Sequence, residues 1–263
     1  MTSPLVFITG ASSGIGQALA WRYHQAGWRL ALVARRADVM AEWVQAQGIA
    51  DDRVRIFAAD VADNGSILQA AEQCMATWGL PQVVIANAGI SQGMDASERE
   101  DLAVLERVMR TNVLGLAATF QPFIRPMQTA SGHGGPFTLV GIASVAGIRG
   151  LPGHAAYCAS KSAVITYCES LRGELRGSQG VRVVTIAPGY IATPLTRKNK
   201  YPMPFLMTAQ DFADRAFQRI EAGNSYAVIP WQMGAVAKLL RLLPNAWFDR
   251  IMQGQPRKHR EPQ

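Results

Sequence analysis

The chain has 263 residues, a hydrophobic content of 49% and a formal net charge of +7. This length and composition favour one folded domain with a large core and exclude a disordered protein. The three cysteines, Cys74, Cys158 and Cys168, are odd in number and lack the C-x-x-C spacing, which argues against a disulfide framework and against a metal site. The N-terminus shows no secretory pattern and no apolar run could span a bilayer, so we expect a cytoplasmic protein.

Short strand-like runs alternate with helical patterns along the chain. The expected strands cover residues 5–9, 29–34, 54–58, 82–86, 136–140, 181–187 and 226–229. The expected helices cover residues 15–26, 38–47, 66–78, 102–124 and 156–176, and a further helix begins at Thr208, where Asp211 completes a capping-box-like start. Several strands are continuously apolar, as in parallel sheets buried on both faces. We therefore predict a single α/β domain with a doubly wound, parallel seven-stranded sheet and helices on both faces.

A glycine-rich turn with the sequence TGASSGIG, residues 9–16, follows the first strand and opens the first helix. Its glycines allow a tight turn and a close approach to a pyrophosphate, while the helix N-terminus offers free amides and the positive end of a dipole. Glycines are common in turns, but this placement indicates a dinucleotide site. The residues assigned to it are Gly10, Ser12, Ser13, Gly14, Ile15 and Gly16.

The second strand ends in the sequence VARR, residues 33–36, without the Asp or Glu that usually binds the adenosine ribose of NAD. A guanidinium here can pair with the 2′-phosphate of NADP, which a carboxylate would repel. We assign this role to Arg35, with Ser12 or Ser13 as a hydrogen-bonding neighbour, and we expect Asp38 to cap the next helix. The alternative is that the two arginines simply begin a solvated loop.

Tyr157 and Lys161 are four residues apart in a predicted helix, so their side chains project from the same face. Such a pair is common by itself. Ser144 supports a catalytic interpretation of the pair, because this residue follows the fifth strand at the carboxyl edge of the sheet, where ligands of doubly wound folds bind. We interpret His154 as structural, although it could line the pocket, and Cys158 lies on another face of the helix and needs no redox role.

These motifs together resemble the short-chain dehydrogenase/reductase family over residues 4 to about 193. The matching features are the turn at 9–16, Asn87-Ala88-Gly89, Asn112, the set Ser144, Tyr157 and Lys161 with 12 residues between Ser and Tyr, and Pro188-Gly189. The resemblance implies a Rossmann fold. It also implies an NADP(H)-dependent oxidoreductase that transfers a hydride between the cofactor and a carbonyl or secondary alcohol.

The resemblance gives each residue of the catalytic set a role. Tyr157 would protonate the carbonyl oxygen during reduction. A free phenol has a pKa near ~10, so the Lys161 cation would be needed to favour the phenolate in the reverse reaction, and it would also bind the nicotinamide ribose. Ser144 would polarise the substrate oxygen, and Asn112 would position a water in a proton relay to the lysine. Asn112 could instead cap a kink in its helix.

Further cofactor contacts follow from the same resemblance. Asp60 would reach the adenine amino group, Val61 would supply a backbone contact, and Thr193 would meet the nicotinamide carboxamide. The remaining residues expected to contact NADP(H) are Asn87, Ala88, Gly89, Pro188, Gly189 and Ile191.

The chain departs from the family members that reduce acyl-carrier-bound ketones at its last strand. Those members tend to end in an Asp-Gly-Gly strand that builds a tetramer, whereas this chain has YAVIPW at residues 226–231. A tetramer of that type is therefore in doubt. We expect a homodimer that forms through the long helices around Asn112 and Tyr157.

The catalytic domain is expected to span residues 1–230 and to include a substrate lid at 194–207. The apolar half of this lid, residues 201–207, could close over a hydrophobic substrate, and Arg197, Lys198 and Lys200 could attract an anionic group. An ordinary surface loop is the alternative.

Residues 231–263 are predicted to form a C-terminal amphipathic helix and a basic tail with six basic and two acidic residues. The apolar stripe of this helix consists of Val236, Leu239, Leu240, Leu243 and Trp247. It could pack on the domain, on a subunit or on a lipid interface, and peripheral membrane contact would suit an apolar or lipid-like substrate. The basic tail is otherwise a solvated end, and nothing resembles a nucleic-acid module.

Two other functions stay open. A catalytically silent NADP-binding regulator or scaffold of the same fold is one, although Ser144, Tyr157 and Lys161 are all present. A sugar-nucleotide epimerase or dehydratase of the extended branch is disfavoured by the three-residue gap between Gly10 and Gly14 and by the short chain.

Overall fold

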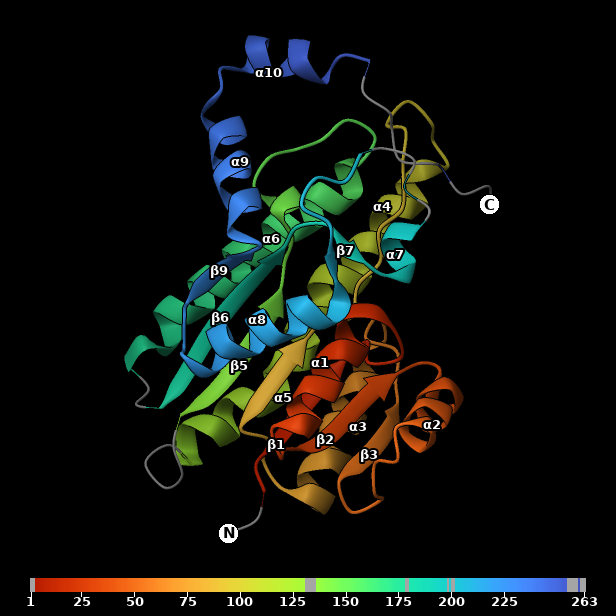
Figure 1. Cartoon of the computed structure of the whole chain (residues 1–263), viewed down its shortest axis with the longest axis vertical. Coiled ribbons are helices and arrows are strands. Elements are labelled where there is room, and N and C mark those ends of the chain that lie inside the picture. Colours follow the sequence, from red (N-terminus) through yellow and green to blue (C-terminus); the bar gives the residue numbers. More distant parts are fainter. Residues whose placement is uncertain are drawn as a thin grey trace.

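The computed structural model describes residues 3–130, 136–177, 180–197, 199, 202–254 and 260. Within these ranges, seven parallel strands form one sheet in the order β3-β2-β1-β4-β5-β6-β9. They are β1 (Leu5–Thr9), β2 (Arg29–Ala34), β3 (Val54–Ala58), β4 (Val83–Ala86), β5 (Phe137–Ile142), β6 (Val181–Pro188) and β9 (Tyr226–Ile229). The seven predicted strands and the doubly wound fold are therefore confirmed, and the strand order reverses between β1 and β4 (Figure 1).

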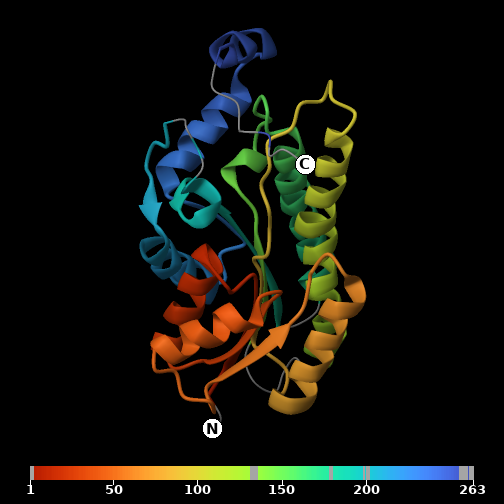
Figure 2. The ribbon, with the colours of Figure 1, turned by 90° about the vertical axis from the view of Figure 1, so that its right-hand side faces the viewer.

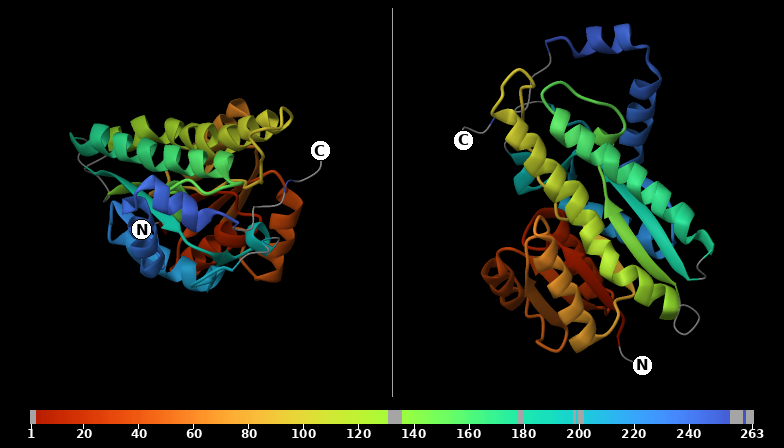
Figure 3. Two further views of the ribbon diagram at one scale, coloured as in Figure 1. Left: turned by 90° about the horizontal axis from the view of Figure 1, so that it is seen from above. Right: turned by 180° about the vertical axis from the view of Figure 1, so that it is seen from behind.

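Helices cover both faces of this sheet (Figures 2 and 3). One face carries α3 (Asn64–Trp78), α5 (Gly115–Ala130) and α6 (Ala155–Glu174), and the other carries α1 (Gly14–Gln25), α2 (Ala37–Ala46) and α8 (Ala209–Glu221). Successive strand residues point to opposite faces: Phe7 packs edge-on against Phe123 of α5, whereas Ile8 lies in the cluster under α1 and α8. Both clusters are buried, which explains why the strands read as continuous apolar runs.

The helix predicted over residues 102–124 is confirmed, and it contains a π-helical turn. The structure has α4 (Asp101–Met109), a π-helical turn η1 (Arg110–Leu114) and then α5. Directly after the turn, Gly115 passes so close to Val61 that a Cβ would lie 2.8 Å from the Val61 carbonyl oxygen. Apolar periodicity predicted this helix but not the π-turn, because it does not register a local change of hydrogen-bond pattern; such turns are frequent at functional sites.

Two predicted helix caps have different outcomes. Thr208 caps α8 as expected: its Oγ1 accepts a hydrogen bond from the Asp211 amide at 3.0 Å and donates to the Asp211 carboxylate at 2.7 Å. Asp38 does not cap α2, because this helix begins at Ala37 and its N-cap residue is Arg36. The Asp38 carboxylate lies in the first turn instead, where a negative charge is favourable near the positive end of the helix dipole.

The C-terminal amphipathic helix is two helices, α9 (Trp231–Leu242) and α10 (Asn245–Met252). Leu243 is extended, with φ of −62° and ψ of 135°, because Pro244 disfavours the helical conformation of the residue before it. The residues of the predicted apolar stripe do not pack on the domain: α9 buries Met233, Gly234 and Ala237, whereas Leu239 and Trp247 remain exposed. Among the described residues, no helix combines the length and apolar character needed to cross a bilayer.

The predicted lid region contains α7 (Pro194–Arg197), and it is flanked by two short parallel strands, β7 (Ile191–Ala192) and β8 (Met207–Thr208). Leu195, Phe205 and Leu206 are exposed in it. Lys198, Lys200 and Tyr201, which belong to the predicted lid, lie outside the described residues.

Candidate active site

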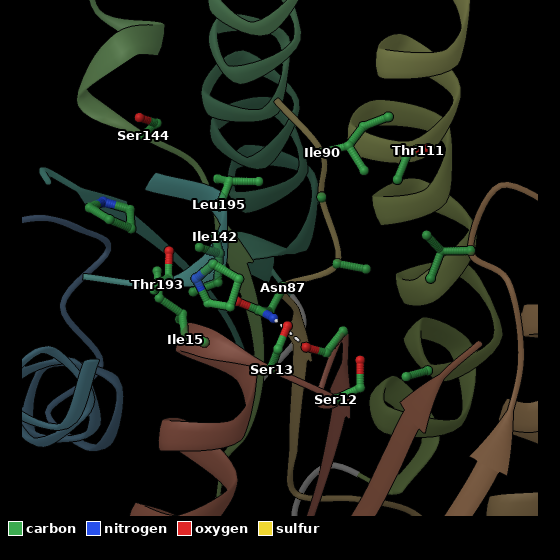
Figure 4. A pocket seen from close by; sticks show the side chains of 18 of the residues that line it. Ser12, Ser13, Ile15, Asn87, Ile90, Thr111, Ile142, Ser144, Thr193 and Leu195 are labelled. Atoms are coloured by element: carbon green, nitrogen blue, oxygen red, sulfur yellow. Dashed lines mark hydrogen bonds between the residues drawn. The ribbon is translucent and has the colours of Figure 1, made fainter. Parts of the chain in front are cut away.

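A cavity of about 670 Å³ opens at the carboxyl edge of the sheet, where the strand order reverses. This volume lies within the range of about 300–1,000 Å³ that is typical of cofactor and ligand sites. Ser12, Ser13 and Ile15 border it on one side and Ser144 lies toward the other (Figure 4). Ligands of doubly wound folds bind at this position, so the fold alone predicts a ligand site here.

The glycine turn between β1 and α1 has the backbone that a phosphate cradle requires. Gly10 and Gly14 adopt φ values of 68° and 59°, which side chains disfavour, and a Cβ on Gly16 would collide with the Gly10 carbonyl oxygen. Asn87 at the end of β4 fixes the turn, because its Nδ2 donates to the carbonyl oxygens of Thr9 at 3.0 Å and Gly10 at 3.3 Å. The turn therefore fits the pyrophosphate of a dinucleotide, whose close approach needs bare backbone.

Two arginines and one aspartate lie at the adenosine end of the cavity. Arg35 forms an exposed ion pair with Asp60, with 3.8 Å between Nη1 and Oδ2. Arg36, which we had not assigned to the site, donates from Nη2 to Ser12 Oγ at 3.5 Å. The serine neighbour expected for Arg35 thus contacts Arg36, and both guanidinium groups line the cavity.

The polar side chains at the opposite end come from β5, the turn after it and α6. Ser144 is buried at the N-cap of η2 (Val145–Gly147), and its Oγ accepts a hydrogen bond from the Ala146 amide at 3.2 Å. The Ser144 side chain also hydrogen-bonds Tyr157. Lys161 lies one helical turn further on, with its Nζ 5.9 Å from the centre of the Tyr157 ring and 2.8 Å from the Ile142 carbonyl oxygen that accepts its hydrogen bond.

Burial changes the acidity of this pair in opposite directions. Loss of solvent raises the pKa of Tyr157 to about 12, and the hydrogen bond with Ser144 opposes this change. Loss of solvent lowers the pKa of Lys161, which is 4% exposed, to about 8. At neutral pH the tyrosine therefore holds its proton and the lysine is mostly cationic. A neutral phenol beside a buried ammonium group is suited to proton donation.

Asn112 lies behind the cavity wall in the η1 turn. Its Oδ1 accepts from the Ile90 amide at 2.8 Å, and its Nδ2 donates to the Ile90 carbonyl oxygen and to Ser160 Oγ, both at 2.9 Å. Ser160 donates in turn to the Tyr157 carbonyl oxygen at 2.8 Å. Asn112 thus joins the segment after β4 to α6.

Most residues predicted for the site lie together. Every predicted cofactor residue except Gly16 lines the cavity, and so does every predicted catalytic residue except Asn112. His154 is buried next to the Pro152 carbonyl oxygen and Cys158 faces a different hollow, so neither lines this cavity.

Several lining residues carried no local motif. Arg107 and Thr111 face the cavity from the helix that leads to Asn112, and their i, i+4 spacing was the available signal. Arg107 donates to Gln92 Oε1 at 3.2 Å. The backbone oxygen of Ile142 had no sequence signal, because any residue at the end of β5 supplies a carbonyl group.

Comparison with known proteins agrees with this geometry. The model of the short chain dehydrogenase family matches residues 4–203. The chain is 36% identical over 253 residues to an uncharacterized oxidoreductase of Myxococcus xanthus, which covers 95% of this chain and 96% of that protein. The chain therefore belongs to the short-chain dehydrogenase/reductase family and is a Rossmann-fold oxidoreductase.

Two solved structures share the fold. A short chain dehydrogenase from Burkholderia cenocepacia in complex with NADP has a TM-score of 0.80 at 21% identity, over 95% of this chain and 98% of that one. A short chain dehydrogenase/reductase from Burkholderia phymatum in complex with NAD has a TM-score of 0.81 at 21% identity, over 99% and 98% of the two chains.

Proposed function

We propose that the protein is an NADP(H)-dependent oxidoreductase that interconverts a carbonyl group and a secondary alcohol. One observation carries the proposal: Tyr157, flanked by Ser144 and Lys161, lines the same cavity as the glycine turn and Arg35. A bound dinucleotide would supply or accept the hydride. Phosphate-binding backbone at one end of a cavity and a proton donor at the other are what this chemistry needs.

Each side chain has a distinct task in the proposed reaction. Tyr157 donates its proton to the carbonyl oxygen during reduction and takes it back in the alcohol direction. Ser144 holds that oxygen by a hydrogen bond. The Lys161 cation lowers the free-energy cost of forming the phenolate, and it would hydrogen-bond the ribose of a bound cofactor. Asn112 would position a water that relays protons to Lys161.

The charge at the adenosine end supports NADP(H) over NAD(H). Arg35 and Arg36 both line the cavity beyond β2. The nearby carboxylate, Asp60, lies within ion-pair distance of Arg35, so that its charge is partly offset there. A 2′-phosphate placed near two guanidinium groups gains charge-assisted hydrogen bonds.

The proposed function is tested by cofactor binding followed by turnover. NADPH should bind more tightly than NADH, and a panel of carbonyl compounds should contain at least one that oxidises NADPH. Tyr157→Phe should bind NADPH normally and lose activity by about 10²–10⁴-fold, because proton transfer contributes that much to the rate. Tight NADPH binding with no turnover would favour the silent regulator, and full activity of Tyr157→Phe would exclude the proposed role of the tyrosine.

The exposed apolar residues support an apolar substrate. Leu195, Phe205 and Leu206 in the lid region are each about half exposed, and Leu195 also lines the cavity. An apolar substrate that enters the cavity would cover such residues. We propose a cytoplasmic enzyme, which the three buried free cysteines support.

Peripheral membrane contact is the second part of this proposal. Trp231, Leu239, Leu242 and Trp247 are between 64% and 81% exposed on α9 and α10, and Lys238 is exposed among them. Exposed tryptophans with basic neighbours suit an anionic lipid interface. Co-sedimentation with phosphatidylserine vesicles should therefore be lost in Leu242→Ser/Trp247→Ser. Equal sedimentation of this variant and the unchanged protein would exclude contact through these helices.

A further inference from the structure

The two C-terminal helices, α9 and α10, contact loops that border the active site. We call them the C-terminal arm (residues 231–252); they lie beyond residues 4–203, which match the family. At the start of the arm, Met233 packs on Gly189, where a Cβ would lie 2.8 Å from Met233 Cγ. Gly189 lines the cavity. The far end of α9 approaches the loop between β5 and α6, which contains Ser144 (Figure 1).

Arg149 makes the contact at this far end. Its Nη1 donates to the carbonyl oxygens of Leu240, Arg241 and Leu243 at 2.7, 3.0 and 2.9 Å. Its Nη2 donates to Asn245 Oδ1 at 3.1 Å, and its guanidinium carbon lies 4.0 Å from the centre of the Phe248 ring. One side chain thus holds the end of α9 and the start of α10.

The sequence of the arm explains why an arginine is needed there. The Leu240 carbonyl oxygen would accept its helical hydrogen bond from residue 244, which is proline and has no N–H. The last carbonyl groups of any helix also lack intrahelical donors and carry the negative end of its dipole. A guanidinium group supplies several N–H donors and a positive charge in one plane, and it can stack on an aromatic ring as well.

Arg149 is connected to Ser144 through the short helix η2. Arg149 lies two residues after η2, and the N-cap residue of η2 is Ser144, whose Oγ accepts a hydrogen bond from the Ala146 amide. The η2 turn packs closely against α6, because a Cβ on Gly147 would lie 2.6 Å from the carbonyl carbon of Lys161. The turn is therefore held between α6 and the C-terminal arm.

We propose that Arg149 is a positioning residue for the active site. It anchors η2 to the C-terminal arm and thereby holds the Ser144 hydroxyl against Tyr157. Arg149 is not among the residues that line the cavity, so it acts through η2 and not on the substrate. This inference rests on the proposed function, in which Ser144 orients the carbonyl oxygen.

The test compares Arg149→Ala, Arg149→Lys and Phe248→Ala in the full chain, with Arg250→Ala as a control because Arg250 is an exposed arginine of the same arm. Arg149→Ala should lower kcat/KM by about 10- to 100-fold, since small misplacements of catalytic groups cost rates of this order. NADPH affinity should stay unchanged. Lysine should restore only part of the activity, because the single nitrogen of an ammonium group cannot replace both Nη1 and Nη2 of the guanidinium group. Arg149→Ala and Phe248→Ala should be non-additive.

Hydrogen–deuterium exchange separates this inference from the proposed function. Amides of residues 143–150 should exchange faster in Arg149→Ala than in the unchanged protein or in Arg250→Ala. Unaltered exchange in this segment would overturn the inference whatever the enzyme does. Normal kcat/KM in Arg149→Ala, with only a lower Tm, would also overturn it. If the protein turned over no carbonyl compound but Arg149→Ala still showed the faster exchange, the proposed function would be contradicted. The role of Arg149 in anchoring η2 would still be supported.

Discussion

Arg35 and Arg36 differ in their present partners, and this difference gives a prediction for cofactor choice. Arg35 lies near Asp60 at 3.8 Å, whereas Arg36 bonds Ser12 at 3.5 Å. We expect Arg35→Ala to weaken NADPH binding by about 10- to 100-fold and to leave NADH binding unchanged, because one hydrogen bond to a charged group contributes about 1.5–3 kcal/mol. Arg36→Ala, the matched variant, should have the smaller effect. Tighter binding of NADH than NADPH by the unchanged protein would remove the basis for either assignment.

The positions of the proposed catalytic residues were predictable from the sequence because their spacing along the chain determines where they lie in the fold. Four residues in a helix place Tyr157 and Lys161 on one face, and a residue directly after a buried strand lies at the sheet edge. The Lys161 bond to the Ile142 carbonyl oxygen was not predictable. Backbone groups have no side-chain signature, and only the packing of α6 on β5 brings this oxygen near.

The buried lysine predicts how stability depends on pH. The pKa of Lys161 is about 8 in the fold, below the 10.5 of a free lysine, so between these values the unfolded chain binds more protons. The free energy of unfolding should therefore rise with pH from 8 to 10.5, by up to about 3 kcal/mol from this group. The measurement is the difference in unfolding free energy between the unchanged protein and Lys161→Met at pH 7 and pH 10. A difference that stays constant would contradict burial of the charged group.

At the scale of elements, the sequence predicts the location of a helix better than it predicts a π-turn or a break within that helix. The break between α9 and α10 occurs within a stretch whose composition favours helix throughout. Pro244 was a visible signal for this break, because proline disfavours helix in the residue before it. The π-helical turn η1, within a helix that was predicted, had no such signal. It coincides with the hydrogen bonds of Asn112 to Ile90, which lies 22 residues earlier in the chain.

The η1 turn makes Asn112 a structural residue as well as a proposed catalytic one. Asn112 is buried and holds the amide and the carbonyl group of Ile90 together with Ser160. Asn112→Ala would leave these groups without partners, which should lower the free energy of unfolding by about 2–4 kcal/mol. Urea denaturation measures this change, and Thr129→Ala at the exposed end of α5 is the control. Equal free energies of unfolding for the two variants would mean that water replaces the side-chain amide of Asn112 without loss of stability.

At the scale of the whole molecule, the exposed apolar residues of α4 and η1 predict an oligomer. Leu102 and Leu114 are 64% and 55% exposed on the side of the sheet that α5 and α6 cover. We expect a homodimer that buries both residues, because specific interfaces bury apolar side chains at their centre. Light scattering should give twice the mass of the 28.5 kDa chain.

Charge substitutions should show whether the dimer forms through Leu102 and Leu114 or through the C-terminal arm. Leu102→Glu/Leu114→Glu should dissociate the dimer, since it places four carboxylates in the interface of a homodimer; at about 2 kcal/mol or more each, they raise the dissociation constant by about 10⁶-fold. Leu239→Glu on α9 is the matched control, because Leu239 is also 64% exposed. If Leu239→Glu alone produced the monomer, the arm would be the interface, and membrane contact through the same residues would require the dimer to open. If neither variant changed the mass, both surfaces would be free for other partners.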